Sequence, residues 1–346
     1  MKKPFLFGFY LLLTISCFGQ NKIDSLLQIG MQYHDNGEYN KAIDIYKQAL
    51  KITPKSTLVN YEISLSYLYA GDNKNAIKHS DFVLKQNKDY LLSAYITKGS
   101  ALDNLGKTEQ SIKLFNEALK NNGDNYLLYY NIGIDYSKIN DTKNAENAFI
   151  KAIQNNSSHN SSHYALALLE SQNNNRVQSL LSLYYFLMLE PSSKRSETAY
   201  TLLKRQLGGN IQKDHDNPMN INVFLNPKNI ESEFGPADTM IAMLEATNML
   251  EENKDKTPEE LFIDNTKSFF KVLGELFEND PKEKDNLWWK FYVPLFYKLA
   301  KSEYMDVFCY YISISSNDKA NKWLDANNEK LKAFAKWLQE QLKTNG

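Results

Sequence analysis

The amino-acid sequence predicts an all-α protein in which a stack of paired helices is followed by a second helical domain. Three observations support this fold class. A skeleton of small and aromatic residues returns every 34 or 35 residues through the first half of the chain. Alternation typical of a strand is confined to residues 221–225. Beyond residue 237, apolar residues recur at the spacing of amphipathic helices.

The N-terminus has the parts of an export signal. Two lysines precede an apolar run over residues 5–15, and Cys17 and Gly19 place small residues at the −3 and −1 positions of a cleavage site. The run is shorter than the roughly 20 residues that span a bilayer. We therefore expect residues 1–19 to be removed and the mature protein to be periplasmic or secreted, without a transmembrane helix. In the alternative, residues 14–17 form a lipoprotein-like motif and Cys17 carries a lipid anchor.

Composition narrows the class of protein. The chain has 346 residues, enough for two domains, and a formal net charge of −1 at pH 7. This balance does not indicate a nucleic-acid binder. Only Cys309 remains after cleavage at Gly19, so an internal disulfide is excluded and we expect the thiol to be a small buried apolar group.

The internal repeat has a constant phase. Five small residues lead the copies, at spacings of 34, 35, 34 and 34: Gly30, Ser64, Gly99, Gly133 and Ala167. The five copies are predicted over residues 23–56, 57–91, 92–125, 126–159 and 160–193. We expect a further amphipathic helix at 193–207 to cap the array, which then covers residues 20–207.

Elementary packing explains the pattern. Each copy is predicted to be two helices joined by a turn whose residue tolerates a left-handed backbone: Gly37, Gly71, Gly106 or Asn140. Small side chains let helix axes approach, and rings such as Tyr46 and Phe115 fill the space between paired helices. A single pair cannot bury its apolar face, so the pairs stack and leave a concave surface.

This skeleton resembles the tetratricopeptide repeat (TPR) family over residues 23–193, about half of the chain. The fifth copy departs most, because Glu170 stands where the first helix normally has an aromatic residue. The resemblance implies a TPR α-solenoid that binds proteins on a concave face built by the first helix of each repeat. Carried over position by position, the groove residues are Leu27, Met31, His34, Tyr61, Leu65, Leu68, Ile96, Asn104, Leu127, Tyr130, Asn131, Ile134 and Tyr164.

The groove inventory restricts the partner. Family members that grip a C-terminal carboxylate use a cluster of Lys, Arg and Asn, whereas Lys138 is the one cation at these positions. Aliphatic and tyrosine side chains favour a partner helix or an extended apolar segment of a protein or peptide. The alternative occupant is the C-terminal half of the same chain.

The second half is predicted to contain a linker, residues 208–236, and a helical domain, residues 237–346. A capping Thr257 followed by Pro258 marks a strong helix start. Trp288, Trp289 and Tyr292 lie in the densest aromatic run of the chain. Because neighbouring helical residues point in different directions, these three form a possible second binding surface; the alternative is a helix buried on several sides.

Catalytic patterns are missing from the sequence. His159 and His163 are four residues apart, but no cysteine or glutamate lies at metal-ligand spacing, and no phosphate-binding glycine loop or nucleophile motif is present. We therefore expect no metal, no cofactor and no enzymatic activity. The function predicted is that of a non-catalytic adaptor or scaffold of the cell envelope; the alternative is small-ligand or glycan binding by the aromatic C-terminal domain.

Overall fold

The computed structural model describes residues 22–86, 89–208, 211–213, 220–279 and 285–344. The expected signal segment and Cys17 lie outside the described residues. The chain falls into two compact units that divide after Ala148. The first unit runs up to Ala148 and the second begins at Phe149, so each is described by itself.

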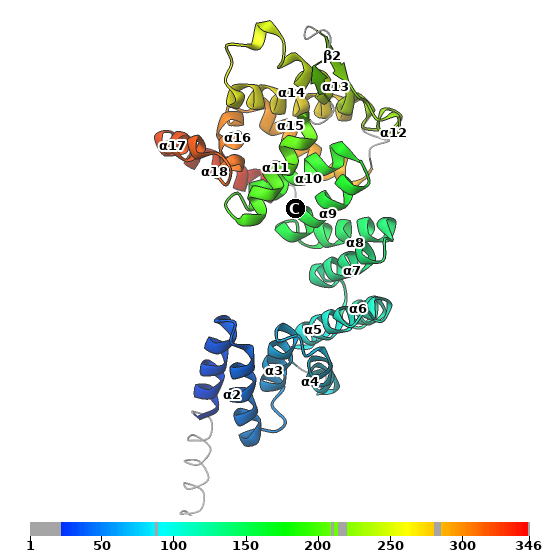
Figure 1. The fold of residues 1–346 in the computed structure, drawn as a ribbon, viewed down its shortest axis with the longest axis vertical. Helices are drawn as coiled ribbons and strands as arrows, with labels where there is room; N and C mark the ends of the chain where they lie inside the picture. Colours follow the sequence, from blue (N-terminus) through cyan, green and yellow to red (C-terminus); the bar gives the residue numbers. More distant parts are fainter. Residues whose placement is uncertain (1–21, 87–88, 209–210, 214–219, 280–284, 345–346) are drawn as a thin grey trace, which may run out of the picture. The chain divides into compact units, whose positions relative to one another are not determined.

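The first unit is a succession of helix pairs (Figure 1). In chain order its elements are a helix over residues 22–35, α2 (Tyr39–Ile52), α3 (Thr57–Tyr69), α4 (Asn73–Gln86), α5 (Leu91–Asn104), α6 (Thr108–Asn122), α7 (Tyr126–Lys138) and the start of α8 (Thr142–Asn155). Each of α2 to α6 packs on the helix that follows it, and α3 packs on α5 and α5 on α7. First helices of successive pairs are therefore in contact, which is the stacking that the periodicity predicts.

The turns between paired helices have the predicted left-handed backbone. Gly37, Gly71 and Gly106 have φ angles of 77°, 80° and 72°, and Asn140 has a φ of 59°. After the first helix, the amides of Gly37 and Glu38 donate to the carbonyl oxygens of His34 and Tyr33, at 2.9 and 2.8 Å. These bonds satisfy carbonyl groups that the helix end leaves without partners.

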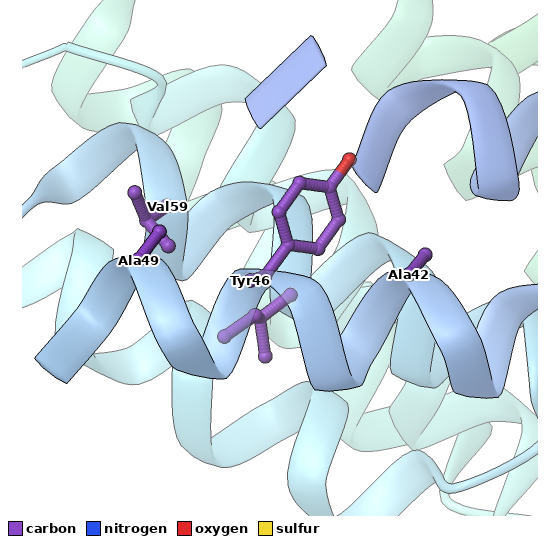
Figure 2. Close-up of a cluster of buried hydrophobic side chains, with 5 residues drawn as sticks. Ala42, Tyr46, Ala49 and Val59 are labelled. Carbon is purple, nitrogen blue, oxygen red and sulfur yellow. The ribbon is translucent and has the colours of Figure 1, made fainter. Parts of the chain in front are cut away.

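Small residues allow the helices of one pair to touch. A Cβ added to Gly30 would lie 2.3 Å from Tyr46, and one added to Gly99 would lie 2.1 Å from Phe115. Figure 2 shows Tyr46 of the first pair between Ala42 and Ala49, with Val59 of the next pair in the same buried cluster. The rings thus occupy the volume that the missing side chains release.

The second unit contains the fifth helix pair and the rest of the chain. Its elements after the end of α8 are α9 (Asn160–Gln172), α10 (Arg176–Leu189), α11 (Lys194–Gly208), β1 (Ile211–Lys213), β2 (Ile221–Val223), α12 (Pro227–Ile230), α13 (Gly235–Thr247), the 3₁₀ turn η1 (Glu251–Asn253), α14 (Pro258–Asn279), the π-helix η2 (Trp288–Tyr292), α15 (Val293–Lys301), α16 (Met305–Ser313), α17 (Asp318–Ala326) and α18 (Asn328–Thr344). No helix of the described ranges is long and apolar enough to cross a membrane.

Helix α10 is the centre of the second unit. It packs against α9, α11, α13, α16 and η2. Every residue from Val177 to Met188 except Gln178 is buried. A helix that is apolar on all sides must be enclosed on all sides. The fifth pair is consequently part of a larger helical unit.

The two units divide after Ala148 and not at residues 208–236, where a linker was expected. Two short strands lie in that segment and pair antiparallel, with Ile211 opposite Val223. Both strands and α12 contact α13. The sequence indicated the strand at 221–223 but not its partner, because three residues are too few for a recognisable pattern. Helix α11 covers α10 as expected of a cap, with Leu202 and Leu203 buried, yet it also contacts α13.

The start of α14 confirms the predicted capping signal. The Thr257 backbone amide donates to Glu260 Oε2 at 2.8 Å, and the Glu260 amide donates to Thr257 Oγ1 at 3.2 Å. This reciprocal pair satisfies two amides that the helix start would otherwise leave exposed.

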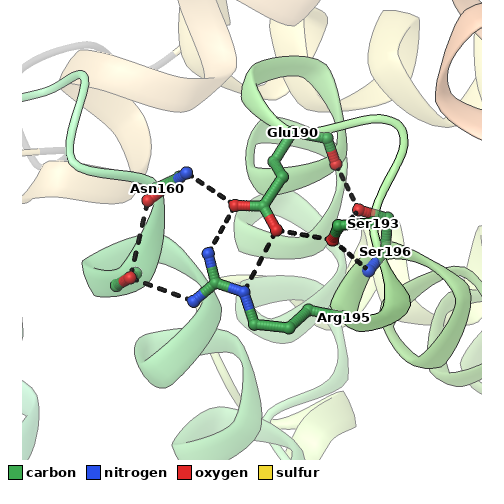
Figure 3. Close-up of polar contacts among 6 residues, drawn as sticks. Asn160, Glu190, Ser193, Arg195 and Ser196 are labelled. Carbon is green, nitrogen blue, oxygen red and sulfur yellow. Dashed lines mark hydrogen bonds and ion pairs between the residues drawn. The ribbon is translucent and has the colours of Figure 1, made fainter. Parts of the chain in front are cut away.

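A polar network joins three helices at one end of α10 (Figure 3). Glu190 accepts from Asn160 Nδ2 and from Ser193 Oγ, both at 2.6 Å, and forms an ion pair with Arg195. Arg195 also donates to Ser161 Oγ at 3.0 Å. The carboxylate therefore links the start of α9 to the start of α11.

Replacing Gly99 tests the close approach of paired helices. We expect Gly99→Ala to destabilise the first unit by about 1 to 3 kcal/mol, because the new methyl group overlaps the Phe115 ring. Chemical denaturation followed by circular dichroism measures the change, with Ser100→Ala as the matched control. Equal stability of the two variants would show that the helices have room to separate.

Candidate partner-binding site

The predicted groove residues of the first unit lie in stripes along the first helices of the pairs. Leu27, Met31 and His34 follow one another at intervals of four and three residues, as Tyr61, Leu65 and Leu68 do on α3. This spacing places each set on one face of its helix. All thirteen predicted positions are at least partly accessible, with Met31 48 % exposed.

An aromatic cluster extends the face of the first two pairs. The His34 ring meets Tyr39 and Tyr69 edge-on at 5.2 and 5.3 Å, and the two tyrosine rings stack at 5.4 Å. His34 Nδ1 lies 2.8 Å from Ser66 Oγ, which fixes the imidazole. Burial lowers the pKa of His34, so the ring is neutral near pH 7. Tyr69 is 59 % exposed and offers the open side of this histidine–tyrosine cluster.

A second aromatic pair joins α3 to the residue that precedes α5. Tyr61 and Tyr90 stack nearly parallel, with ring centroids 5.3 Å apart and planes at 10°. Tyr90 precedes α5 with a left-handed φ of 67° and is 40 % exposed. Sequence analysis missed Tyr39 and Tyr90 because both lie outside the first helices. One general signal could have indicated these two residues, since Tyr and Trp are frequent anchors in protein interfaces.

Two acidic side chains adjoin these rings. Asp35 follows His34, and Glu62 follows Tyr61. Burial raises the pKa of Glu62, and the charge of Asp35 acts in the same direction. Among the described residues neither carboxylate is in an ion pair. Asp35 is exposed and Glu62 is half-buried, so the open negative charge beside this aromatic surface is mainly that of Asp35.

Two lysines of the first helices, Lys98 on α5 and Lys138 on α7, are in ion pairs. Lys138, the cation that the sequence singled out, binds Asp103. Lys98 binds Asp81 at 2.7 Å. A site for a carboxylate terminus would need cations that are available to it.

The third and fourth pairs contribute less free surface. Ile96 packs against the core cluster of Phe115 and Leu128. Asn104 donates to Asn73 Oδ1 at 3.3 Å, and the Asn131 amide donates to the Leu127 carbonyl at 2.7 Å. The remaining predicted side chains, Leu127, Tyr130 and Ile134, are half-buried on α7.

Tyr164 belongs to the second unit. Its ring stacks on Phe186 at 4.7 Å, and the Arg195 guanidinium lies 5.9 Å from the ring centroid. These contacts anchor α9 to α10 and α11.

The expectation that Trp288, Trp289 and Tyr292 form a binding surface is wrong. They are 3 %, 0 % and 0 % exposed. Trp289 stacks on Phe234 at 4.6 Å and donates from Nε1 to Glu233 at 2.6 Å. The residues lie in a π-helix, whose wider turn changes the directions of neighbouring side chains. The alternative, a helix buried on several sides, is the one that the structure shows.

The other polar residues singled out by sequence are structural. His163 is buried, with Nδ1 2.6 Å from the Tyr292 hydroxyl and Nε2 2.9 Å from the Ser157 carbonyl oxygen. Burial lowers its pKa to about 3. Cys309 is buried, which raises the pKa of its thiol. Within the described ranges no group of three or more His, Cys, Asp or Glu side chains could hold a metal ion.

These features define a helical repeat protein whose first helices carry an accessible aromatic face. A family model described as tetratricopeptide repeat matches residues 23–56, 92–125 and 126–159, which are the first, third and fourth predicted copies. These three stretches, all in the N-terminal half of the chain, are similar to tetratricopeptide repeats. A fold of this kind generally serves as a scaffold for protein–protein interaction.

Known relatives share part of the chain. The TPR repeat-containing protein MJ1428 of Methanocaldococcus jannaschii is 27 % identical over 128 residues, 37 % of this chain and 22 % of that protein's length. The structure of TTC0263, a thermophilic TPR protein of Thermus thermophilus, has a TM-score of 0.46 at 19 % identity and covers 54 % of this chain and 98 % of its own. The structure of YrrB, described as a TPR protein with an unusual peptide-binding site, has a TM-score of 0.39 at 16 % identity and covers 55 % and 97 %.

A buried carboxyl on α7 makes the first unit sensitive to pH. Burial raises the pKa of Asp135 from 3.8 to about 6, and the charge of Asp103 acts in the same direction. Because the folded protein holds this proton more tightly, the contribution of Asp135 is favourable below about pH 3.8 and is lost as pH rises through 6.

Removing the charge should therefore stabilise the protein above pH 6. We expect Asp135→Asn to raise the free energy of unfolding at pH 7.5 by about 1 to 2 kcal/mol and to have little effect at pH 4. Thermal denaturation across this pH range measures the difference, with the exposed Asp44→Asn as control. A variant that is less stable than the parent at pH 7.5 would contradict the raised pKa.

Proposed function

We propose that this protein is a non-catalytic adaptor that holds a segment of a partner protein on the aromatic face of its repeat array. The observation that supports this most is the accessible set formed by the histidine–tyrosine cluster, the Tyr61–Tyr90 stack and Met31. Tyrosine rings give a large contact area and lose little rotational freedom on binding, which makes them frequent anchors in interfaces.

The charges of this face indicate the chemistry of the partner. Apolar side chains of a bound segment would cover the rings, and a lysine or arginine beside them would neutralise Asp35 and Glu62. A carboxylate terminus is disfavoured because Lys98 and Lys138 are engaged. We therefore propose an apolar segment that carries a basic residue.

A display library of peptides tests this function on the full mature chain. We expect selected sequences to combine aliphatic or aromatic residues with Lys or Arg, and Tyr61→Ala with Tyr69→Ala to weaken their binding at least tenfold, because both anchors are removed. Fluorescence anisotropy of a labelled selected peptide measures the affinity.

Tyr129→Ala is the matched control, because Tyr129 lies two residues after Leu127 and so on the opposite side of α7 from the groove residues. In a second comparison, the library is selected on the double variant Asp35→Asn, Glu62→Gln. The selected peptides should then lack the basic residue. Undiminished binding by the double tyrosine variant would remove this face as the binding site. A library that yields no binder would favour occupation of the groove by the second half of the chain.

We further propose that the adaptor works outside the cytoplasm, in the cell envelope. The support is the pattern of two lysines, an apolar run and small residues over residues 2–19. A periplasmic scaffold would meet envelope proteins during their assembly.

Export is tested by the mature N-terminus. We expect mass spectrometry of the protein from the cell envelope fraction to show a chain that begins at Gln20, and Cys17→Ser to leave its fractionation unchanged. A chain that begins at a lipid-modified Cys17, lost in the Cys17→Ser variant, would support the lipoprotein alternative instead. Full-length protein in the cytoplasm would contradict export.

A further inference from the structure

A polar cavity lies in the second unit. Its volume is about 330 Å³. Its walls come from the end of α9 and the turn after it, the start of α10, the end of α11 and the start of α12. The lining residues are Ser171, Asn174, Arg176, Arg205, Gln206, Asn226 and Asn229.

The lining has an unusual composition. It consists of two guanidinium groups, four carboxamides and one hydroxyl, and none of the described residues that line it is acidic. Ligand cavities are generally dominated by apolar and aromatic side chains. The groups here are mainly hydrogen-bond donors, and carboxylate ligands for a metal cation are missing.

Arg176 is held rigidly at the wall. Its side chain is 7 % exposed, and its Nε donates to Asp238 Oδ1 at 2.7 Å. Nη2 donates to the Asp238 carbonyl oxygen, whereas Nη1 is buried without a hydrogen-bond partner in the described part of the chain. A smaller cavity of about 40 Å³ is lined by the same Arg176. A fixed guanidinium with a spare donor loses little entropy when it binds an oxyanion.

Arg205 supplies the uncompensated charge. Asp238 balances Arg176, but among the described residues Arg205 is in no ion pair. Its guanidinium is exposed at the cavity. The net positive charge of the lining therefore rests on Arg205, and a ligand anion would be its natural counter-charge.

The carboxamides suit hydroxyl groups. Gln206 donates from Nε2 to Ser179 Oγ at 3.0 Å, and its Oε1 is a buried acceptor without a partner in the described chain. Amide side chains both donate and accept, as a hydroxylated ligand requires. A volume of about 330 Å³ also exceeds what a lone oxyanion needs and lies at the lower end of small-molecule pockets.

We propose that this cavity binds a small hydroxylated organic anion, in which a phosphate or carboxylate group is joined to a polyol or sugar body. The anionic group is bound by Arg205 and the spare donor of Arg176. The hydroxyl groups exchange hydrogen bonds with the amides of Gln206, Asn226 and Asn229. This site is independent of the partner-binding face of the array.

Isothermal titration of the full mature chain tests the proposal. The probes are glucose 6-phosphate, gluconate, inorganic phosphate and neutral glucose. We expect the two organic anions to bind at least tenfold more tightly than glucose or inorganic phosphate. If glucose bound as tightly as the anions, the ligand's charge would play no part and the proposal would be wrong. If inorganic phosphate bound as tightly as glucose 6-phosphate, the hydroxylated part of the ligand would not be recognised, which would also overturn the proposal.

Variants locate the binding in this cavity. Arg205→Gln should weaken the affinity for glucose 6-phosphate or gluconate at least tenfold, and Asn229→Ala should weaken it severalfold, with unchanged thermal denaturation. The control is Lys271→Gln, which removes an exposed cation from α14. Unchanged affinity in both cavity variants would overturn the assignment. The display-selected peptides should bind these variants normally, so failure of this site is distinguishable from failure of the adaptor function.

Discussion

The approach of paired helices over glycine is the constraint on which the first unit depends. Gly30 and Gly99 leave room for Tyr46 and Phe115, and a methyl group at either glycine would overlap the ring. Because these rings fill the space inside each pair, the stripe of Leu27, Met31 and His34 is left for contacts outside the pair. The composition of the candidate binding face therefore follows from the packing of the repeat. Partner binding needs no special architecture beyond that packing, only suitable side chains on the outer stripe.

The side chains of this stripe differ from the Lys, Arg and Asn cluster of a carboxylate clamp. Lys98 and Lys138 are in ion pairs with Asp81 and Asp103, while the exposed Asp35 follows His34 of the histidine–tyrosine cluster. An accessible anion beside an apolar surface gives specificity mainly by rejecting partners of the wrong charge. On the proposed function, the same backbone geometry would suit a different class of ligand when a few side chains change.

Sequence predicted the array well because its signals are local. The turn at Gly37 needs a left-handed residue, and the start of α14 needs the Thr257–Glu260 pair; both follow from backbone chemistry within a few residues. The predicted stripe positions are likewise accessible. Tyr90 escaped prediction because it reaches Tyr61 from a turn, outside the helical period. The cavity at Arg205 could not be foreseen, since it joins residues 171 to 229 through tertiary packing.

Helix α10 differs from the second helices of the earlier pairs in how much of its surface is buried. In the first pair, α2 buries one stripe and leaves residues such as Lys47 and Lys51 in solvent. From Val177 onward α10 is apolar almost all round, so a solvated neighbour could not satisfy it. Helices α13 and α16 satisfy it instead. This enclosure places Arg176, the first residue of α10, against Asp238 of α13, where burial of an ion pair requires tight geometry. The polar cavity thus lies where α10, the second helix of the last pair, is enclosed by the other helices of the second unit. Its chemistry is set by α9 and the turn after it, α10, α11 and the start of α12, and no tyrosine is among its lining residues.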